Sequence, residues 1–329
     1  MARNKKKTLV VLATSGSNTD SIGYTTAQLG VAELIQAMPC LAELPCTLVC
    51  EQVGQIYSRD MSFDVWQRLL SRAAHWLAVP EVQGVVITHG TDTLEETAFY
   101  LHCALPRPLL ASKPVVFTCA MRLATALNAE GPQNIRDAIT VALMPGACGV
   151  LVVCAGAVHS AAHLQKVRPY RLDAFNSGDA GPLGYVEEGA VRMLKQWFLR
   201  PLGALALEYH SEKTINNIAS SMRWPRVEIL MNYAGAGALP VDALLVQLAS
   251  QQGAALRGIV VAGTGNGTVH EELEAALLRA QACNVAVRRT SRCAMGQLIL
   301  APNAALPHSE GLSPVKARIA LMLELMASD

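Results

Sequence analysis

The sequence predicts an α/β protein with a large N-terminal domain, a parallel sheet with helices on both faces, and a smaller C-terminal α/β domain. Short apolar runs alternate with segments of helical spacing along most of the chain, which is the pattern of parallel strands joined by crossover helices. The chain has 329 residues, more than one hydrophobic core usually accommodates. Hydrophobic residues make up 51% of the chain and charged residues 16%, which indicates a well-buried globular protein.

The N-terminal domain is expected to cover residues 1–195. Buried parallel strands are predicted from four apolar runs rich in β-branched residues, at residues 9–13, 84–88, 114–118 and 149–154. Helices are predicted between them because apolar residues recur there every three or four positions, at residues 30–38, 62–77, 93–104 and 134–143.

A linker is expected over residues 196–224, because the periodicity becomes unclear from about residue 185 onward. The C-terminal domain is then expected over residues 225–329. Its predicted elements are strands at residues 227–231 and 258–262 and helices at residues 241–252, 269–283 and 313–326. Pro314 in the first turn suits the start of the last helix, which is predicted to be amphipathic.

Composition excludes several classes of protein. A net charge of +1, with no basic stripe carrying aromatic residues, argues against nucleic-acid binding. No apolar run approaches the roughly 20 residues of a membrane span, and the run at residues 8–13 is shorter than the ~7–15 residues of a signal-peptide core. Nine cysteines occur without a CxxC pair; Cys119, Cys154 and Cys283 are expected to be reduced core residues of a cytoplasmic protein.

Residues 84–97 are the most informative segment, because a predicted buried strand ends there at Gly90 and is followed by Thr91 and Asp92. Thr93 or Asp92 can cap the next helix, whose first turn carries two glutamates, the charge that a helix N-terminus favours. In α/β sheets, ligands bind at strand ends of this kind. The segment therefore predicts a site of chemistry.

Other candidate positions have an ordinary structural explanation when each is taken alone. Ser17 lies in a hydroxyl-rich segment after the first predicted strand, which is also typical of a strand-to-helix turn. Ser58 and Arg59 lie in a second predicted loop, where a simple turn is sufficient. Lys166 is a single lysine, a residue type that is mostly solvated at the surface.

No metal ion and no cofactor are expected. His159 and His163 are four residues apart, as helical zinc ligands can be, but the glutamate of an HExxH motif and a third ligand are missing. Residues 263–267, Gly-Thr-Gly-Asn-Gly, follow a predicted strand, yet they lack the GxGxxG spacing of dinucleotide-binding loops.

In combination, these segments resemble the bacterial-type L-asparaginase family. Residues 88–97, Thr-His-Gly-Thr-Asp-Thr-Leu-Glu-Glu-Thr, resemble the second signature of that family, which is highly specific. The similarity runs through most of the chain, at residues 115–122, 128–134, 149–153, 172–178, 181–184, 232–234, 263–267 and 314–317. The resemblance implies the asparaginase-like two-domain fold with a catalytic N-terminal domain. It also implies homodimers or homotetramers in which the partner's C-terminal domain completes each active site.

The resemblance further implies roles for individual residues. The family's first hydroxyl nucleophile falls on Ser17 and its activating tyrosine on Tyr24. Ser58 matches the residue that holds the substrate α-carboxylate, and Arg59 occupies a position, often glutamine, that faces the substrate α-ammonium.

A second catalytic group is implied at Thr91, Asp92 and Lys166, with Asp92 also binding the substrate. An aliphatic hydroxyl is a poor nucleophile until a base accepts its proton. A neutral lysine can be that base; desolvation favours its neutral form, whereas a neighbouring carboxylate opposes it and orients the ammonium. Backbone N–H groups would stabilise the developing oxyanion.

Several positions depart from the family pattern. The first signature, usually Thr-Gly-Gly-Thr-Ile-Ala, is Thr-Ser-Gly-Ser-Asn-Thr at residues 14–19. Ser17 keeps the hydroxyl of threonine but loses the methyl group that restricts χ1, and Ser15 replaces a glycine. Leu123 replaces a proline, and Asn303 is roughly in register with a glutamate that the partner subunit supplies in periplasmic relatives.

Three hypotheses follow. The first is an asparaginase-type amidohydrolase that releases ammonia from L-asparagine, giving L-aspartate, or from a close analogue. The second is a related amidohydrolase with another substrate, because a guanidinium at Arg59 disfavours an α-ammonium and favours an amide that lacks it or carries an extra carboxylate. The third is a non-catalytic or repurposed protein of this fold that binds an amino acid or a related small molecule, suggested by the altered first signature.

Overall fold

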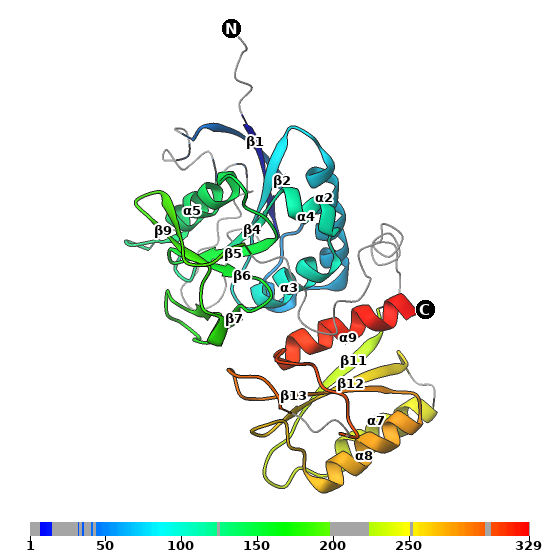
Figure 1. Ribbon diagram of the computed structural model, residues 1–329. Helices are drawn as coiled ribbons and strands as arrows, with labels where there is room; N and C mark the ends of the chain where they lie inside the picture. The colour runs from blue at the N-terminus through cyan, green and yellow to red at the C-terminus, as the bar shows by residue number, and fades with distance from the viewer. Residues whose placement is uncertain are drawn as a thin grey trace. The chain divides into compact units, whose positions relative to one another are not determined.

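The computed structural model describes residues 7–14, 32, 35, 41, 44–123, 126–197, 224–250, 253–299 and 304–328 (Figure 1). They form two units, one holding the described residues up to 197 and the other those from 224 onward. Most of the predicted linker, residues 196–224, lies outside the described residues, so the predicted domain boundaries stay a prediction. In the described part of the chain, no helix combines the length and the apolar character needed to cross a membrane.

The first unit is built on an eight-stranded sheet with the strand order β10-β9-β6-β5-β4-β3-β1-β2. Five strands are parallel: β1 (Lys7–Ala13), β2 (Cys46–Gln52), β3 (Val82–Thr88), β4 (Val115–Thr118) and β5 (Val150–Cys154). Three more extend the sheet in antiparallel fashion: β6 (Ala157–Ser160), β9 (Gly184–Glu187) and β10 (Ala190–Met193). The predicted parallel sheet is confirmed, with an antiparallel edge that the sequence pattern did not indicate.

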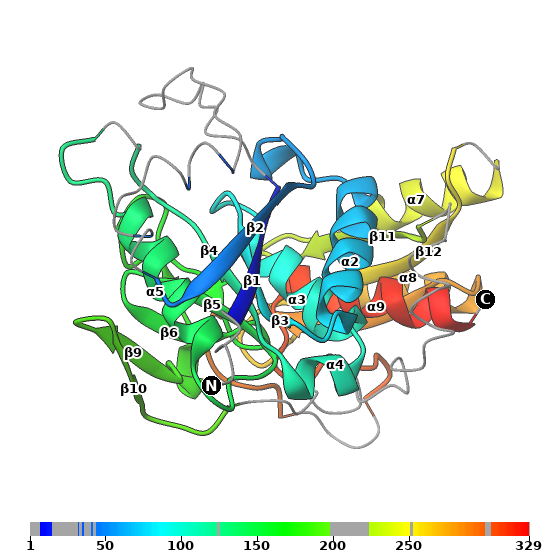
Figure 2. The same cartoon turned by 90° about the horizontal axis from the view of Figure 1, so that it is seen from above.

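Helices cover both faces of this sheet, as predicted (Figure 2). On one face, α5 (Gly131–Leu143) packs its residues Ile135, Ala138 and Ile139 against alternate side chains of the parallel strands. The other face carries α2 (Phe63–Ala78) and α3 (Leu94–Ala104), with the short α4 (Arg107–Ser112) against α2. This sandwich buries the parallel strands on both sides, which explains their continuous apolar character.

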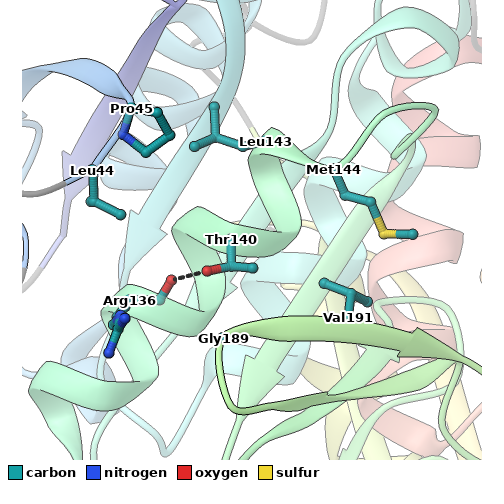
Figure 3. Close-up of a pocket in the computed structure, with 8 residues that line it drawn as sticks. All are labelled: Leu44, Pro45, Arg136, Thr140, Leu143, Met144, Gly189 and Val191. Carbon is teal, nitrogen blue, oxygen red and sulfur yellow. Dashed lines mark hydrogen bonds between the residues drawn. The ribbon is translucent and has the colours of Figure 1, made fainter.

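A mostly apolar pocket of about 440 Å³ lies between α5 and the turn that joins β9 to β10 (Figure 3). Met144 follows the end of α5, and Pro45 directly precedes β2. Pro45 stands at the amino end of a parallel strand, so the pocket lies toward the amino ends of the parallel strands. The turn from β3 into α3 lies at their carboxyl ends.

The second unit contains a parallel three-stranded sheet of order β11-β12-β13. Its strands are β11 (Arg226–Met231), β12 (Leu256–Gly263) and β13 (Ala286–Ser291). One face is covered by α7 (Leu239–Ala249) and α8 (Glu271–Ala282), and the other by α9 (Pro314–Ser328). The predicted α/β character of this part is confirmed.

Some predictions from the sequence were wrong in detail. Strands β2 and β13 and helix α4 were not predicted, and most of the predicted helix at residues 30–38 lies outside the described residues. Cys283 is exposed at the end of α8 rather than in the core. Helix α9 is buried without interruption from Ile319 to Leu323, so it is not amphipathic there.

Candidate active site

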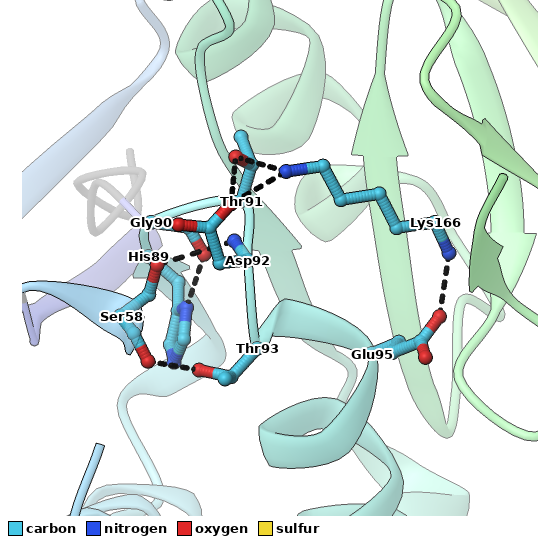
Figure 4. Close-up of polar contacts among 8 residues, drawn as sticks. All are labelled: Ser58, His89, Gly90, Thr91, Asp92, Thr93, Glu95 and Lys166. Carbon is cyan, nitrogen blue, oxygen red and sulfur yellow. Dashed lines mark hydrogen bonds and ion pairs between the residues drawn. The ribbon is translucent and has the colours of Figure 1, made fainter. Parts of the chain in front are cut away.

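The candidate site begins where the buried strand β3 ends, at residues 89–93 (Figure 4). This short segment turns into α3, for which Thr93 is the N-cap residue. Thr93 is one of the two predicted cap positions, but its side chain does not cap the helix. Instead, the Thr93 hydroxyl donates a hydrogen bond to the Ser58 carbonyl oxygen at 2.6 Å. The segment is thereby attached to a loop far away in sequence.

Lys166 meets Thr91 and Asp92 although it lies about 75 residues further along the chain. Its Nζ donates to Thr91 Oγ1 at 2.9 Å and to Asp92 Oδ1 at 2.6 Å, and the Thr91 hydroxyl is 3.5 Å from Asp92 Oδ1 (Figure 4). The Lys166 side chain is 16% exposed, while that of Asp92 is 57% exposed. The arrangement places a hydroxyl, an amine and a carboxylate within direct reach of one another, with the carboxylate open to solvent.

The position of Lys166 is set by its backbone as well as by its side chain. Lys166 ends β7 (Gln165–Lys166), which pairs with β8 (Phe175–Asn176), and Phe175 is its partner in the register. Its backbone N–H donates to the carboxylate of Glu95 in the first turn of α3. The same helix that follows Asp92 therefore holds the strand that carries the lysine.

Ser58 supports the segment from the opposite side. It is buried in the short 3-10 helix η2 (Ser58–Asp60), and its Oγ accepts the Asp92 backbone N–H at 3.1 Å. A Cβ atom placed on Gly90 would lie 2.5 Å from Ser58 Oγ and 2.8 Å from its Cβ. Glycine is therefore required at position 90 by close approach, and not by an unusual backbone angle.

A buried chain of hydrogen bonds anchors the base of the segment. His89 Nδ1 lies 2.6 Å from the Gly90 carbonyl oxygen and Nε2 lies 2.9 Å from Thr97 Oγ1, which accepts from Trp66 Nε1 at 2.9 Å. Because a carbonyl only accepts, Nδ1 carries the proton and the Thr97 hydroxyl donates to Nε2. Burial lowers the pKa of His89 to about 4, so the imidazole is neutral and this order of donors is maintained near neutral pH.

Arg59 is directed to its own neighbours in sequence. Its guanidinium lies over the Tyr57 ring at 4.7 Å from the ring centre, and its Nε is 3.5 Å from Asp60 Oδ2. The side chain is 55% exposed. The charge of Arg59 is thus partly compensated by a carboxylate and an aromatic face.

The structure brings together Thr91, Asp92, Lys166 and Ser58 from three separate segments, with Arg59 next to Ser58 in the chain. Ser17 and Tyr24 lie outside the described residues, as do Ser15 and Asn303.

The two histidines considered as metal ligands are not on a helix. His159 lies in β6, where its Nδ1 is 2.8 Å from Ser177 Oγ, and His163 follows in a turn. Among the described residues, no group of three or more His, Cys, Asp or Glu side chains is arranged to hold a metal ion.

Four residues that hold the site in place were not predicted from the sequence: Glu95, His89, Thr97 and Trp66. Glu95 was noted only as a favourable charge at a helix start, and its contact with Lys166 is not visible without the fold. For His89 and Thr97, the available signal was their spacing of eight positions across a strand-to-helix turn, and this spacing gave no indication of Trp66.

Comparison with known proteins decides the family. Residues 8–198 match the family model for the N-terminal domain of asparaginase, and residues 226–329 match the C-terminal domain of glutaminase/asparaginase. The chain belongs to the asparaginase family. Its similarity to the bacterial-type L-asparaginases is thereby confirmed over both domains.

Individual relatives agree with this assignment. The chain is 32% identical to L-asparaginase 2 of Bacillus subtilis, over 96% of this chain and 81% of that protein. It is 34% identical to the glutaminase-asparaginase of Pseudomonas fluorescens biotype A, over 98% of this chain and 87% of that protein. A crystal structure of a "Probable Cytoplasmic L-asparaginase" from Campylobacter jejuni superposes with a TM-score of 0.81 at 30% identity, covering 97% of this chain and 95% of that one. The asparaginase-like fold is therefore shown by sequence and structure alike.

Proposed function

We propose that this chain is an asparaginase-type amidohydrolase that releases ammonia from L-asparagine, giving L-aspartate, or from a close analogue. The observation that carries the proposal is the contact of Lys166 Nζ with both Thr91 Oγ1 and Asp92 Oδ1 at the end of β3. Relatives named L-asparaginase and glutaminase-asparaginase align over almost the whole chain, which supports amide hydrolysis as the reaction.

In the proposed mechanism, Ser17 attacks the amide carbon with assistance from Tyr24. The Thr91 hydroxyl then serves the second step, either as a nucleophile or by orienting water. Lys166 Nζ, 2.9 Å from that hydroxyl, accepts its proton when the amine is neutral. Asp92, 2.6 Å from Nζ, orients the amine and stabilises the ammonium that results.

The substrate's α-groups are assigned to Ser58 and to the carboxylate of Asp92. Ser58 receives the α-carboxylate and Asp92, whose side chain is largely exposed, receives the α-ammonium. The bond from the Asp92 N–H to Ser58 Oγ couples these two subsites, so a shift in one displaces the other.

Two substitutions test the proposed roles: Thr91→Val removes the hydroxyl and Lys166→Met removes the amine at similar volume. Loss of a positioned acid–base group typically costs ~10²–10⁴-fold in rate, and that loss is expected in kcat for ammonia release from L-asparagine. Thermal unfolding and aspartate binding serve as controls for folding and for the α-group subsites. Variants that turn over asparagine at the rate of the parent chain would exclude these roles.

An altered substrate is the second candidate, and Arg59 is the observation that favours it. A cation beside Ser58 favours an amide that lacks the α-ammonium or carries an additional carboxylate. We expect Arg59→Gln to shift relative kcat/KM toward asparagine and away from succinamate-like and N-acylated amides. An unchanged preference would show that Arg59, because it is stacked on Tyr57 and in contact with Asp60, does not determine which substrate is preferred.

The same ligands and amide substrates distinguish a binding protein without turnover from an enzyme. If thermal-shift titration with aspartate and asparagine shows binding while no ammonia is released from asparagine, succinamate-like or N-acylated amides, the non-catalytic hypothesis replaces the enzymatic one.

We also propose a cytoplasmic homodimer or homotetramer with active sites shared between subunits. The Campylobacter jejuni neighbour is described as cytoplasmic, whereas a Haemophilus influenzae relative is named periplasmic. Light scattering of the purified protein gives the subunit number, and fractionation of the source cells gives the location.

A further inference from the structure

Cys119 and Cys154 face each other at the carboxyl ends of two neighbouring parallel strands. The register of β4 with β5 pairs Thr118 with Val153, so the next residue of each chain segment is a cysteine. Their Sγ atoms are 2.9 Å apart, and both side chains are buried, at 8% and 5% exposed. Both thiols are free. Adjacent strands lie about 4.8 Å apart, within the span of Cα separations that a disulfide bridges.

The backbones around the two cysteines are tied together independently of the sulfurs. The Asn134 side chain, itself 4% exposed, donates to the Cys119 carbonyl oxygen at 2.8 Å and accepts the Ala155 N–H at 3.1 Å. One amide thus clamps the residue that carries the first thiol to the residue after the second. This clamp does not involve the sulfurs, so it can hold the two strand ends together before and after a bond forms between them.

We propose that Cys119 and Cys154 are a modification site: a two-electron oxidant of the peroxide class converts this dithiol into an intramolecular disulfide. The Cys119 sulfur attacks one peroxide oxygen, the O–O bond breaks, and the leaving oxygen takes the thiol proton and departs as water. The Cys154 sulfur then attacks the resulting sulfenic sulfur, the S–S bond forms, the S–O bond breaks, and a second water carries away the Cys154 proton. Two sulfurs are oxidised by one electron each, and one peroxide is reduced to two waters.

The surroundings of the pair make this reaction slow, not absent. The contact with Cys154 and burial raise the pKa of the Cys119 thiol, while the positive charge of Lys166 acts in the opposite direction. A higher pKa leaves less thiolate, which is the reacting form. The exposed Cys283 and Cys293 are expected to react with alkylating reagents first. This difference allows the exposed thiols to be blocked before the buried pair is oxidised.

The experiment uses the full chain. Native protein is alkylated with N-ethylmaleimide, freed of reagent, treated with hydrogen peroxide, then unfolded and labelled with iodoacetamide. Unreduced peptides are analysed by mass spectrometry. A cross-linked peptide containing Cys119 and Cys154 is expected, two hydrogen masses below the sum of its parts and lost on reduction. The cross-link closes a loop of about 35 residues and should raise the unfolding temperature by several degrees.

Three single variants make the result specific. Cys119→Ser and Cys154→Ser should each abolish the cross-link and the rise in unfolding temperature, whereas Cys148→Ser, which removes another buried cysteine, should retain both. If iodoacetamide labels both sulfurs in full after treatment with hydrogen peroxide, or if Cys119 is linked to a cysteine other than Cys154, the proposal is overturned.

Discussion

Two loops occupy the same place in the two units and keep their shapes in different ways. Residues 89–93 follow β3, which lies between β1 and β4, and residues 264–268 follow β12, which lies between β11 and β13. The second loop closes on itself, because the backbones of Thr264 and Thr268 exchange two hydrogen bonds of 2.9 Å. Asn266 and Ser291 add outside contacts to a frame that is already closed.

The loop at residues 89–93 has no such internal frame. Its backbone and side chains are held from outside, by Ser58, Thr97, Lys166 and the Thr118 carbonyl, which accepts the His89 N–H at 3.0 Å. A loop shaped by distant contacts can present its side chains to one another in a geometry that local sequence could not maintain. Such a loop is sensitive to changes elsewhere in the unit, and substitutions at those distant positions can therefore test the difference between the two loops.

Lowering the pH should reveal the largest difference in stability between the two units. Burial lowers the pKa of His89 and of His159 to about 4 in the folded first unit, against 6.5 in an unfolded chain. The unfolded state therefore takes up protons first as pH falls from 6.5, and stability declines until pH reaches about 4. Each histidine is expected to cost about 3 kcal/mol across this window. His270 and His308 of the second unit are exposed, so that unit should lose less.

Urea unfolding of the full chain at pH 7 and at pH 4.5, followed by proteolysis or hydrogen exchange to locate the unfolding unit, measures this effect. His159→Asn, which removes one buried imidazole away from residues 89–93, should reduce the pH dependence by about half. Equal acid sensitivity in this variant and the parent would contradict the assignment to buried histidines.

Crowding at Gly90 should have the next largest effect. The Cβ of Gly90→Ala would meet Ser58 Oγ at 2.5 Å, so the segment must move away from Ser58. Overpacking of this kind costs ~1–3 kcal/mol, and a displacement of about 1 Å in a catalytic segment can lower activity by ~10²-fold. We expect kcat/KM for ammonia release to fall by that amount and the unfolding midpoint to fall with it.

A second substitution distinguishes crowding from other causes. Ser58→Gly removes both atoms that the new methyl group would meet, so Gly90→Ala combined with Ser58→Gly should regain stability but not activity. A double variant that is as unstable as Gly90→Ala alone would place the strain elsewhere.

How far the sequence could predict this molecule depends on whether the signal was local. The strands β1, β3, β4 and β5 were predicted because burial on both faces leaves a continuous apolar run. Strand β2 was missed because its exposed and half-buried positions break that run. Lys166 was found only through family resemblance, since no spacing rule connects a two-residue strand to a loop 75 residues earlier.

Removal of the Thr97 hydroxyl tests one of the distant contacts that hold the loop at residues 89–93. Thr97→Val leaves the Trp66 N–H and the His89 Nε2 without this partner inside the core, and each lost partner costs ~1–3 kcal/mol. Thr97→Ser keeps the hydroxyl and should cost about 1 kcal/mol for the lost methyl group. Denaturant unfolding of both variants measures the difference, and equal stabilities would show that the hydrogen-bond chain contributes nothing.

The smallest effect is expected in the self-contained loop. Gly265 has φ of +49°, and a Cβ at this position would meet no atom within 4 Å. Gly265→Ala should therefore cost only the left-handed backbone penalty of ~1–2 kcal/mol, and Gly265→Asn less, because asparagine tolerates this conformation. Because the backbone pair of Thr264 and Thr268 already closes this loop on itself, the loss should be the same when measured alone or together with Thr97→Val. A combined loss that departs from the sum by more than about 0.5 kcal/mol would mean that the two loops are coupled, and that the contrast between them is not one of local against remote support.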